Sequence, residues 1–388
     1  MISKLGRAFA AAILAATIGL AGTAHASGPA LPGRAEILGS IERLADWQLA
    51  HLDDLSYIPA ARSSTRSPRD WQQAAFWVAL TGVADRSASP RFRDAIFATG
   101  RREQWRLGDR LYHADDHLIG AVWLWAARHG AGPEALAPMK ASFEKMLAAP
   151  QTGTLLFAAP QSGDPDCTVR WCWCDALFMA PPTLYGLTRE TGDPRYAAFA
   201  HSEYQAVTGV LFDKAEKLYF RDSRFFDQRG GHGEKLFWSR GNGWVFSGLA
   251  RLIPELPRSD PRRAYYVDLF KTMAARLVTL QRPNGYWPPS LLADPARSAD
   301  ETSGTGFYVH GLAWGIKTGL LPRARYLPAV TRGWAALQRA IQPDGRLGWV
   351  QQVSDRPDVV AAQDTQFYGV GAFLLAGGAV YDLAGTKR

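Results

Sequence analysis

The steady recurrence of helix-like segments is the feature of this 388-residue chain that most restricts its fold. Most of these segments carry apolar residues at three- and four-residue spacing, which is typical of helices with one buried face. Strand-like alternation is scarce. The expected helices span residues 36–52, 70–81, 90–105, 115–128, 133–147, 176–189, 194–211, 243–253, 260–280, 304–317, 325–341 and 366–383.

The joints between these segments also repeat. Residues 191–195 and 258–262 contain Asp-Pro, which suits a helix start because proline is tolerated in the first turn. A second joint, Pro-Asn-Gly at 283–285 and Pro-Asp-Gly at 343–345, predicts tight turns that end a helix abruptly. The unit is therefore a helical hairpin of roughly 60 residues, repeated about six times.

Six such hairpins predict an all-α fold, an (α/α)6 barrel formed by residues 27–388 as one domain. An open solenoid would instead need capping repeats with a polar outer face. The longer loops fall on one set of joints and are rich in Trp, Arg and Gly. We therefore expect a closed ring whose long loops surround a cleft at one end.

Residues 1–26 have the features of a secretory signal. Lys4 and Arg7 precede an apolar run at 8–22, and Ala24-His25-Ala26 has the small-x-small pattern of a cleavage site. The apolar run is short for a membrane span, and we expect no later span. The sequence thus predicts a periplasmic or secreted protein that is not embedded in a membrane.

The formal net charge is +8, and the signal carries two of the positive charges. A basic protein favours anionic partners. The basic residues are scattered among acidic ones, however, which argues against nucleic acid as the partner. A small anionic ligand held by one or two arginines fits better, and the sequence is compatible with a monomer or a weak dimer.

Fourteen tryptophans are an unusual number, and many lie beside Gly, Pro or charged residues. Indole faces stack on the C–H faces of sugar rings. The densest stretch is WCWCDALFMAPP at 171–182, in which Trp173 and Asp175 precede the start of a helix. Asp175 either caps this helix or meets a sugar at its mouth.

The three cysteines, Cys167, Cys172 and Cys174, lie within eight residues of one another. In an exported protein they allow one local disulfide with one free thiol, and buried thiols remain an equal alternative. Zinc is not expected, because no matching pair of ligands lies elsewhere in the sequence.

The stretch YHADDHLIG at 112–120 offers two adjacent acids, Asp115 and Asp116. They either favour the dipole of a helix start or place a carboxylate opposite Asp175. His113 and His117 have the spacing of metal ligands on a helix, but no third ligand is evident. We therefore expect no metal.

Two further stretches combine aromatic and cationic residues. In LYFRDSRFF at 218–226, Arg221 or Arg224 either pairs with Asp222 or binds a uronate carboxylate, which suits the planar guanidinium. In FWSRGNGW at 237–244, Trp238, Arg240 and Asn242 either build a turn or bind ligand.

The stretch DETSGTG at 300–306 contains Glu301 and Thr302. These two residues either cap a helix or make polar contacts with a ligand. The sequence contains no Walker loop, no Rossmann fingerprint and no Gly-x-Ser-x-Gly elbow. Cofactor chemistry is therefore not expected. What remains is acid–base chemistry by carboxylates on a sugar.

Together these stretches resemble glycoside hydrolase family 105, the unsaturated rhamnogalacturonyl hydrolases, which is related to family 88. The resemblance rests on YHADDHLIG, WCDALFMAPP, FWSRGNGW, ETSGTG at 301–306 and YGVGAFLLA at 368–376, in the expected order. It implies an (α/α)6 barrel without a cofactor. It also implies removal of a 4,5-unsaturated uronic acid from the non-reducing end of lyase-generated oligosaccharides, with unsaturated galacturonate linked to rhamnose as the first expectation.

By position, the resemblance implies that Asp175 donates the proton and activates water. It makes Asp115 the second carboxylate, with Asp116 beside it as a binding residue or its alternate. Trp173 would be a platform for the sugar. The resemblance implies uronate-binding roles for Trp238, Arg240 and Asn242. Many family members have histidine where this chain has Arg221, which leaves the substrate preference open.

Three alternatives remain open from the sequence. The substrate could instead carry unsaturated glucuronate, as in fragments of ulvan or glycosaminoglycans. A sugar epimerase on a similar barrel would need histidine bases, for which His201 and His310 are the loose candidates. A sugar-binding protein would keep the tryptophans and arginines but would not need two carboxylates facing one ligand.

Overall fold

The computed structural model describes residues 30–59, 63–149, 153–157, 170–294 and 299–385. The signal expected at 1–26 and Cys167 lie outside these ranges, so export of the protein stays a prediction. Within the described ranges the only two strands, β1 (Phe212–Asp213) and β2 (Leu218–Tyr219), form a small antiparallel pair. Helices dominate the rest.

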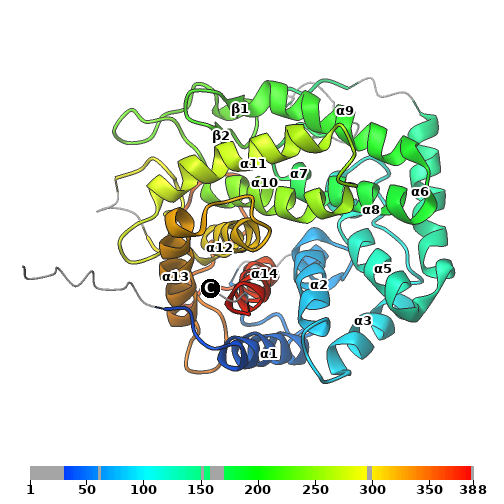
Figure 1. The fold of residues 1–388 in the computed structure, drawn as a ribbon, viewed down its shortest axis with the longest axis horizontal. Helices are drawn as coiled ribbons and strands as arrows, with labels where there is room; N and C mark the ends of the chain where they lie inside the picture. The colour runs from blue at the N-terminus through cyan, green and yellow to red at the C-terminus, as the bar shows by residue number, and fades with distance from the viewer. Residues whose placement is uncertain (1–29, 60–62, 150–152, 158–169, 295–298, 386–388) are drawn as a thin grey trace, which may run out of the picture.

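Six outer helices and six inner helices alternate along the described chain and form two concentric layers (Figure 1). The outer layer comprises α1 (Arg34–Ala50), α3 (Arg91–Arg102), α6 (Ala137–Ala148), α9 (Pro194–Leu211), α11 (Arg263–Leu277) and α13 (Arg323–Arg339). The inner layer comprises α2 (Trp71–Ala84), α5 (Gly120–Ala126), α8 (Pro181–Thr191), α10 (Ser239–Leu252), α12 (Thr302–Lys317) and α14 (Phe367–Ala384). The predicted (α/α)6 barrel is confirmed.

Two of the expected inner helices are interrupted. The helix expected at 115–128 begins as the short α4 (Ala114–His117) before α5, and the one expected at 176–189 begins as α7 (Ala176–Met179) before α8. Pro181 and Pro182 lack the backbone N–H that a continuous helix would use, which accounts for the second break. Single turns occupy Ser63–Arg66, Ala127–Ala131, Pro133–Leu136, Ser223–Phe225, Ile253–Glu255 and Val278–Leu280.

The ring closes where α14, the last helix, packs against α2, the first inner helix. A Cβ atom placed on Gly371 of α14 would lie 2.6 Å from the carbonyl oxygen of Ala75 in α2. Gly306 of α12 is equally close to the backbone of Ala372 in α14. Glycine therefore lets neighbouring inner helices approach backbone to backbone.

Helix α14 is also long and apolar enough to cross a membrane by length and composition. The expectation that no segment after the signal is long enough for a span is therefore wrong on length alone. In the barrel, 78% of this helix is buried. A helix that is apolar on all sides also fits the core of a large soluble protein.

The predicted repeat of the tight turns is visible in the backbone. Arg282 N–H donates to Tyr286 O at 2.9 Å, and Gln342 N–H donates to Arg346 O at 2.7 Å. Gly285 and Gly345, 60 positions apart, have φ values of 97° and 87°, a conformation that glycine adopts without strain. These turns lead from the outer helices α11 and α13 towards the inner helices.

The amino-terminal ends of the inner helices meet at one end of the barrel. Trp71 begins α2, Trp238 immediately precedes α10, and Asp175 immediately precedes α7. Helix dipoles place partial positive charge at such ends. This end of the barrel is therefore suited to an acidic ligand.

We predict that Gly371→Ala destabilises the fold by about 1–3 kcal/mol, because the new methyl group must push α14 away from α2. Gly209→Ala in α9 is the matched control, since a Cβ atom there meets nothing within 4 Å. The control should be neutral or stabilising by about 0.5–1 kcal/mol through helix propensity. Urea unfolding of both variants measures the difference, and equal stabilities would contradict the close packing at Gly371.

Candidate active site

A cavity of about 550 Å³ opens at the end of the barrel where the inner helices begin. Five of the residues singled out from the sequence line it together: Asp115, Trp173, Asp175, Arg221 and Trp238. The rest of the wall comes from Trp71, Phe157, Met179, Arg224, Val353, Ser354 and Asp355. The cavity thus brings three carboxyl groups, two guanidinium groups and several aromatic rings to one space.

Asp175 occupies the N-cap position of α7, but its side chain makes no capping hydrogen bond. The Sγ thiol of Cys174 instead donates to its Oδ1 at 3.3 Å. Asp175 is only 8% exposed. Burial raises the pKa of Asp175, while the positive charge of Arg221 opposes that rise. The carboxyl is therefore left available to the cavity, and burial shifts its pKa in the direction of the neutral form.

Asp115 lies in α4 and faces the same cavity, with its side chain 15% exposed. Burial raises the pKa of Asp115 to about 8, and the negative charge of Asp175 adds to this rise, whereas Arg110 opposes it. Two neighbouring carboxyl groups in a desolvated site cannot both ionise at low cost. At neutral pH the pair therefore retains a proton that can be donated.

His113 lies between Asp115 and Trp173. Its Nδ1 is 3.8 Å from Oδ2 of Asp115, and its ring lies 4.8 Å from that of Trp173. Burial lowers the pKa of His113 to about 3, so the imidazole is neutral and the contact with Asp115 is not an ion pair. Nδ1 is buried without a hydrogen-bond partner.

Arg221 and Arg224 form the cationic side of the cavity. Both donate to Asp222, Arg221 at 2.7 Å and Arg224 at 2.9 and 2.8 Å. Arg224 also donates to Asp355 at 2.8 Å and stacks on the ring of Phe157. Nε of Arg221 is buried without a partner, so this guanidinium keeps a free donor. The two arginines thus pair with Asp222 and line the cavity at the same time.

Arg240 does not reach the ligand space, contrary to the expectation that it binds a uronate. Its guanidinium is completely buried and donates to the carbonyl oxygens of Gln351 and Gln352 at 2.8 and 2.9 Å. It stacks between the rings of Trp238 and Tyr368. Arg240 therefore holds the wall that Trp238 presents to the cavity.

Asn242, Glu301 and Thr302 are likewise fully buried and do not line the cavity, so their contacts with a ligand stay predictions. Asn242 exchanges two hydrogen bonds with the backbone of Tyr219, which ties α10 to β2. Glu301 caps α12 through Ser303 and Gly304, and Thr302 donates to Gly348 O at 2.8 Å. Glu301 thus satisfies the start of an inner helix, whereas Asn242 and Thr302 satisfy backbone groups of Tyr219 and Gly348.

Asp116 also points away from the cavity. Its carboxylate accepts from the backbone N–H of Arg110 at 2.7 Å and from the guanidinium of the same residue at 3.0 and 2.5 Å. The expectation that it contacts substrate therefore stays a prediction as well. Of the two adjacent acids, Asp115 is the one that faces the cavity.

The cysteines of the described chain differ in state. Cys172 is disulfide-bonded, whereas Cys174 is a free, buried thiol. Burial raises the pKa of the Cys174 thiol well above its usual value. It is therefore a hydrogen-bond donor to Asp175 and not a nucleophile.

Trp71, Phe157 and Asp355 were not foreseen as parts of the site. Trp71 stacks on Tyr368 of α14, with ring centroids 5.1 Å apart. It is the first residue of an inner helix, and that position in the hairpin repeat could have predicted it. Phe157 and Asp355 lie in irregular segments, for which the sequence carries no comparable signal.

Metal ligands do not converge in this part of the structure. Among the residues that the structure describes, no group of three or more His, Cys, Asp or Glu side chains could hold a metal ion. His113 and His117 do not act together, because His117 contacts Leu111 O at 2.9 Å through Nε2.

Comparison with protein families shows which family this barrel belongs to. The model of Glycosyl Hydrolase Family 88 matches residues 40–384. The chain belongs to Glycosyl Hydrolase Family 88. The family resemblance inferred from the sequence is thereby confirmed, and the family 88 chain is an enzyme of the glycoside hydrolase class.

Two relatives share much of their length with this family 88 chain. It is 40% identical to an unsaturated 3S-rhamnoglycuronyl hydrolase of Alteromonas sp. over 86% of this chain and 83% of the relative. It is 35% identical to a protein of the same name from Formosa agariphila, over 90% and 91% of the two chains.

Two solved structures have a similar fold. One is a glycosyl hydrolase family 88 protein from Bacteroides vulgatus, 25% identical, with a TM-score of 0.77 over 91% of this chain and 100% of that one. The other is described as a polysaccharide lyase, 27% identical, with a TM-score of 0.77 over 92% and 99% of the two chains.

We predict that Glu301→Gln lowers the free energy of unfolding by about 1–3 kcal/mol, because buried donors of α12 lose a charged acceptor. Asp268→Asn on the exposed face of α11 is the isosteric control and should stay within about 0.5 kcal/mol of the parent. Chemical unfolding measures both. A Glu301→Gln variant as stable as its control would argue against the capping role.

We also predict a pH-dependent effect of Asp115→Asn. Because the pKa of Asp115 is raised in the fold, the parent loses stability as pH rises from about 4 to about 8. The asparagine variant does not ionise there, so its Tm relative to the parent should rise by about 2 °C or more across this range. Thermal unfolding at pH 4, 6 and 8 tests this, and a constant difference would contradict the raised pKa.

Proposed function

We propose that this protein removes a 4,5-unsaturated uronic acid from the non-reducing end of an acidic oligosaccharide by hydrating the ring double bond. One observation carries the proposal: Asp175 lies at a helix start without capping it and shares a desolvated cavity with Asp115. Burial raises the pKa of both carboxyl groups. A proton is thus held where a sugar can enter.

The reaction follows from this placement. Neutral Asp175 donates its proton to C4 of the unsaturated ring, and positive charge develops at C5 and the ring oxygen. The aspartate so formed then takes a proton from water as the water oxygen bonds to C5. The resulting hemiketal opens to a ketone at C5, and the hemiacetal at C1 releases the leaving sugar. The net change is the addition of one water and cleavage into two products.

The cationic wall supports recognition of the uronate carboxylate. Arg221 lines the cavity and has an unpartnered Nε, so we assign the carboxylate to this side chain. Trp173 and Trp238 supply flat apolar surfaces beside it, which suit the faces of a pyranose ring. Asp115 is the second carboxyl group in the cavity that Asp175 lines. The repulsion between two negative charges there opposes ionisation of both groups at once.

The names of the two relatives bear on the leaving sugar. Both are unsaturated 3S-rhamnoglycuronyl hydrolases. We therefore propose that rhamnose follows the unsaturated uronate, and that 3-sulfated rhamnose, as in ulvan fragments, is preferred to the pectin-derived galacturonyl rhamnose expected from the sequence. Action after export, on products of a polysaccharide lyase, is part of the same proposal.

The other candidate activities have less support. A lyase would need a base to remove the C5 proton. Burial raises the pKa of Asp115 and of Asp175, and the third carboxyl group of the cavity, Asp355, is engaged by Arg224 and Arg356. An epimerase would need histidine bases in the cavity. His201 lies on the outer helix α9 and is hydrogen-bonded to Tyr266. His310 lines a different cavity.

The absorbance of the conjugated double bond provides the assay. Purified protein with chelator present is mixed separately with lyase digests of ulvan, rhamnogalacturonan I and chondroitin. We expect absorbance to fall fastest in the ulvan digest. A fall only in the rhamnogalacturonan I or chondroitin digest would reassign the substrate, and a rise in absorbance would indicate a lyase.

In the same assay we predict that Asp175→Asn lowers turnover by at least about 10³-fold, because an amide cannot donate the proton. The variant should keep a Tm close to that of the parent and still bind product, as measured by calorimetry. Asp268→Asn on the surface of α11 is the control and should turn over normally. Near-normal turnover by Asp175→Asn would remove Asp175 from the proposed role.

A further inference from the structure

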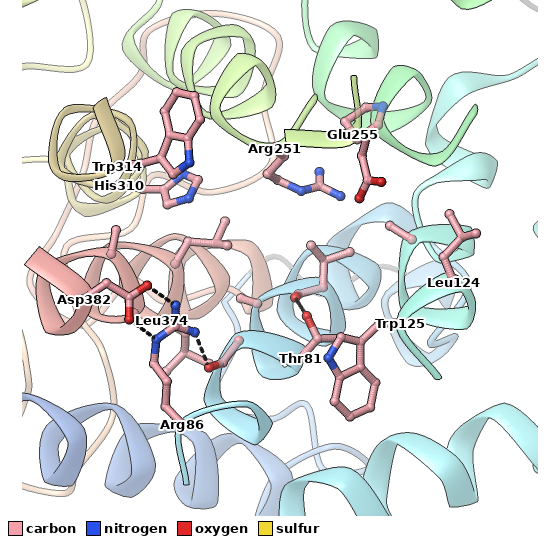
Figure 2. A pocket seen from close by; sticks show the side chains of 18 of the residues that line it. Thr81, Arg86, Leu124, Trp125, Arg251, Glu255, His310, Trp314, Leu374 and Asp382 are labelled. Atoms are coloured by element: carbon pink, nitrogen blue, oxygen red, sulfur yellow. Dashed lines mark hydrogen bonds and ion pairs between the residues drawn. The ribbon is translucent and has the colours of Figure 1, made fainter. Parts of the chain in front are cut away.

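A second cavity, of about 280 Å³, lies at the opposite end of the barrel from the candidate active site. It is surrounded by the later turns of the inner helices, including Thr81 of α2, Arg251 of α10, His310 of α12 and Leu374 of α14. Figure 2 shows Arg251 extending into this space, with His310 and Trp314 on one side and Arg86 on another. The proposed hydrolysis uses none of these groups.

The charged groups that line this cavity do not balance. Arg86, Arg128, Arg251 and Lys317 contribute four positive charges, against the two carboxylates of Glu255 and Asp382. Arg86 is matched by Asp382, to which it donates through Nε at 3.0 Å and through a terminal nitrogen. Arg128 donates to both oxygens of Glu255 at 3.0 Å and to Glu190 at 2.6 Å.

Arg251 differs from the other two arginines that line this cavity, although its guanidinium extends towards Glu255 in Figure 2. It donates to the carbonyl oxygen of Phe178 at 3.0 Å and stacks on the ring of that residue, but it forms no ion pair with any carboxylate of the described residues. Burial lowers the pKa of Arg251 to about 9, with Glu255 acting in the opposite direction. A guanidinium in such surroundings stays charged at neutral pH and favours a counter-ion.

His310 supplies a neighbouring polar atom. Its Nδ1 is engaged with the hydroxyl of Ser247 at 2.7 Å, and its side chain is 8% exposed. Burial, together with the charges of Arg251 and Arg86, lowers the pKa of His310 to about 3, so the ring is neutral. In the tautomer in which Nδ1 accepts from Ser247, Nε2 carries the proton and is a donor for the cavity.

We propose that this second cavity is a binding site for a small oxyanion, with the guanidinium of Arg251 as its principal ligand and His310 as a neutral donor. The volume corresponds to roughly nine water molecules at about 30 Å³ each, so it admits a sulfate, a phosphate or a monosaccharide uronate. The shared chemistry is a compact anionic oxygen group. The site is independent of the proposed active site, which lies at the other end of the barrel.

A purely structural role for Arg251 makes a different prediction. Carbonyl groups at the carboxyl-terminal ends of helices carry partial negative charge, and an arginine can satisfy them without any ligand. In that case Arg251→Gln would lower the stability equally in all buffers. In the proposed case the variant would in addition lose the response to anions.

The test uses the full mature chain in titrations with sulfate, phosphate and glucuronate, each at constant ionic strength set with chloride. We expect at least one of the three to raise the Tm of the parent and to bind in isothermal titration calorimetry. Arg251→Gln should weaken that binding by about tenfold or more, and Arg251→Lys should retain part of it. Arg93→Gln, on the exposed side of α3, is the control and should bind as the parent does.

The three titrations distinguish the kinds of anion that the site could bind. Preference for sulfate or phosphate assigns an inorganic oxyanion, and preference for glucuronate assigns a carboxylate-bearing sugar. No binding of any of the three would overturn the proposal, as would equal binding by Arg251→Gln and the parent. If Arg251→Gln does not fold, His310→Phe, which removes the neutral donor together with its contact to Ser247, must weaken binding for the proposal to stand.

Discussion

The desolvation of two carboxyl groups in one cavity is the constraint on which the rest of this site depends. Asp115 and Asp175 come from different hairpins and face the same space only because the ring of helices closes. Burial raises the pKa of each, and the arginines on either side, Arg110 and Arg221, limit the rise. The barrel thereby keeps a proton beside the substrate space at a pH where a free aspartic acid would have lost it.

Several residues maintain this arrangement without touching the cavity. Arg240 fixes the indole of Trp238 by stacking and by two hydrogen bonds to the segment at Gln351 and Gln352. Glu301 accepts from the first backbone groups of α12, and Asn242 ties α10 to the strand pair. Buried polar groups held by several partners in this way make the walls of a site rigid.

The sequence predicted the fold well because the fold is a repetition. Each hairpin leaves the same periodic apolar pattern and the same turn residues, and the closed ring follows from their number. It also predicted Asp115, Trp173, Asp175, Arg221 and Trp238, which the structure brings to one cavity. It also assigned ligand contacts to buried residues that do not line the cavity, namely Arg240, Asn242, Glu301, Thr302 and Asp116. A buried polar residue gives the same local signal in the sequence whether it binds a ligand or pairs with protein groups.

The residues that the sequence did not indicate belong to segments without periodicity. Phe157 and Asp355 reach the cavity through long-range placement, and Arg251 becomes unusual only when the carboxylates near it are known. Their roles depend on tertiary neighbours, which a local pattern does not encode. The proposed chemistry depends on the carboxyl pair alone and can be tested separately from these residues.

The most direct test compares two disaccharides that differ only in the C4–C5 bond of the terminal uronate. One carries the double bond, and the other carries the saturated uronate with the same linkage to rhamnose. If Asp175 protonates the double bond, the enzyme releases rhamnose from the unsaturated disaccharide and leaves the saturated one intact. Release of rhamnose from the saturated disaccharide at a similar rate would mean that the anomeric carbon is attacked directly, and it would contradict the account.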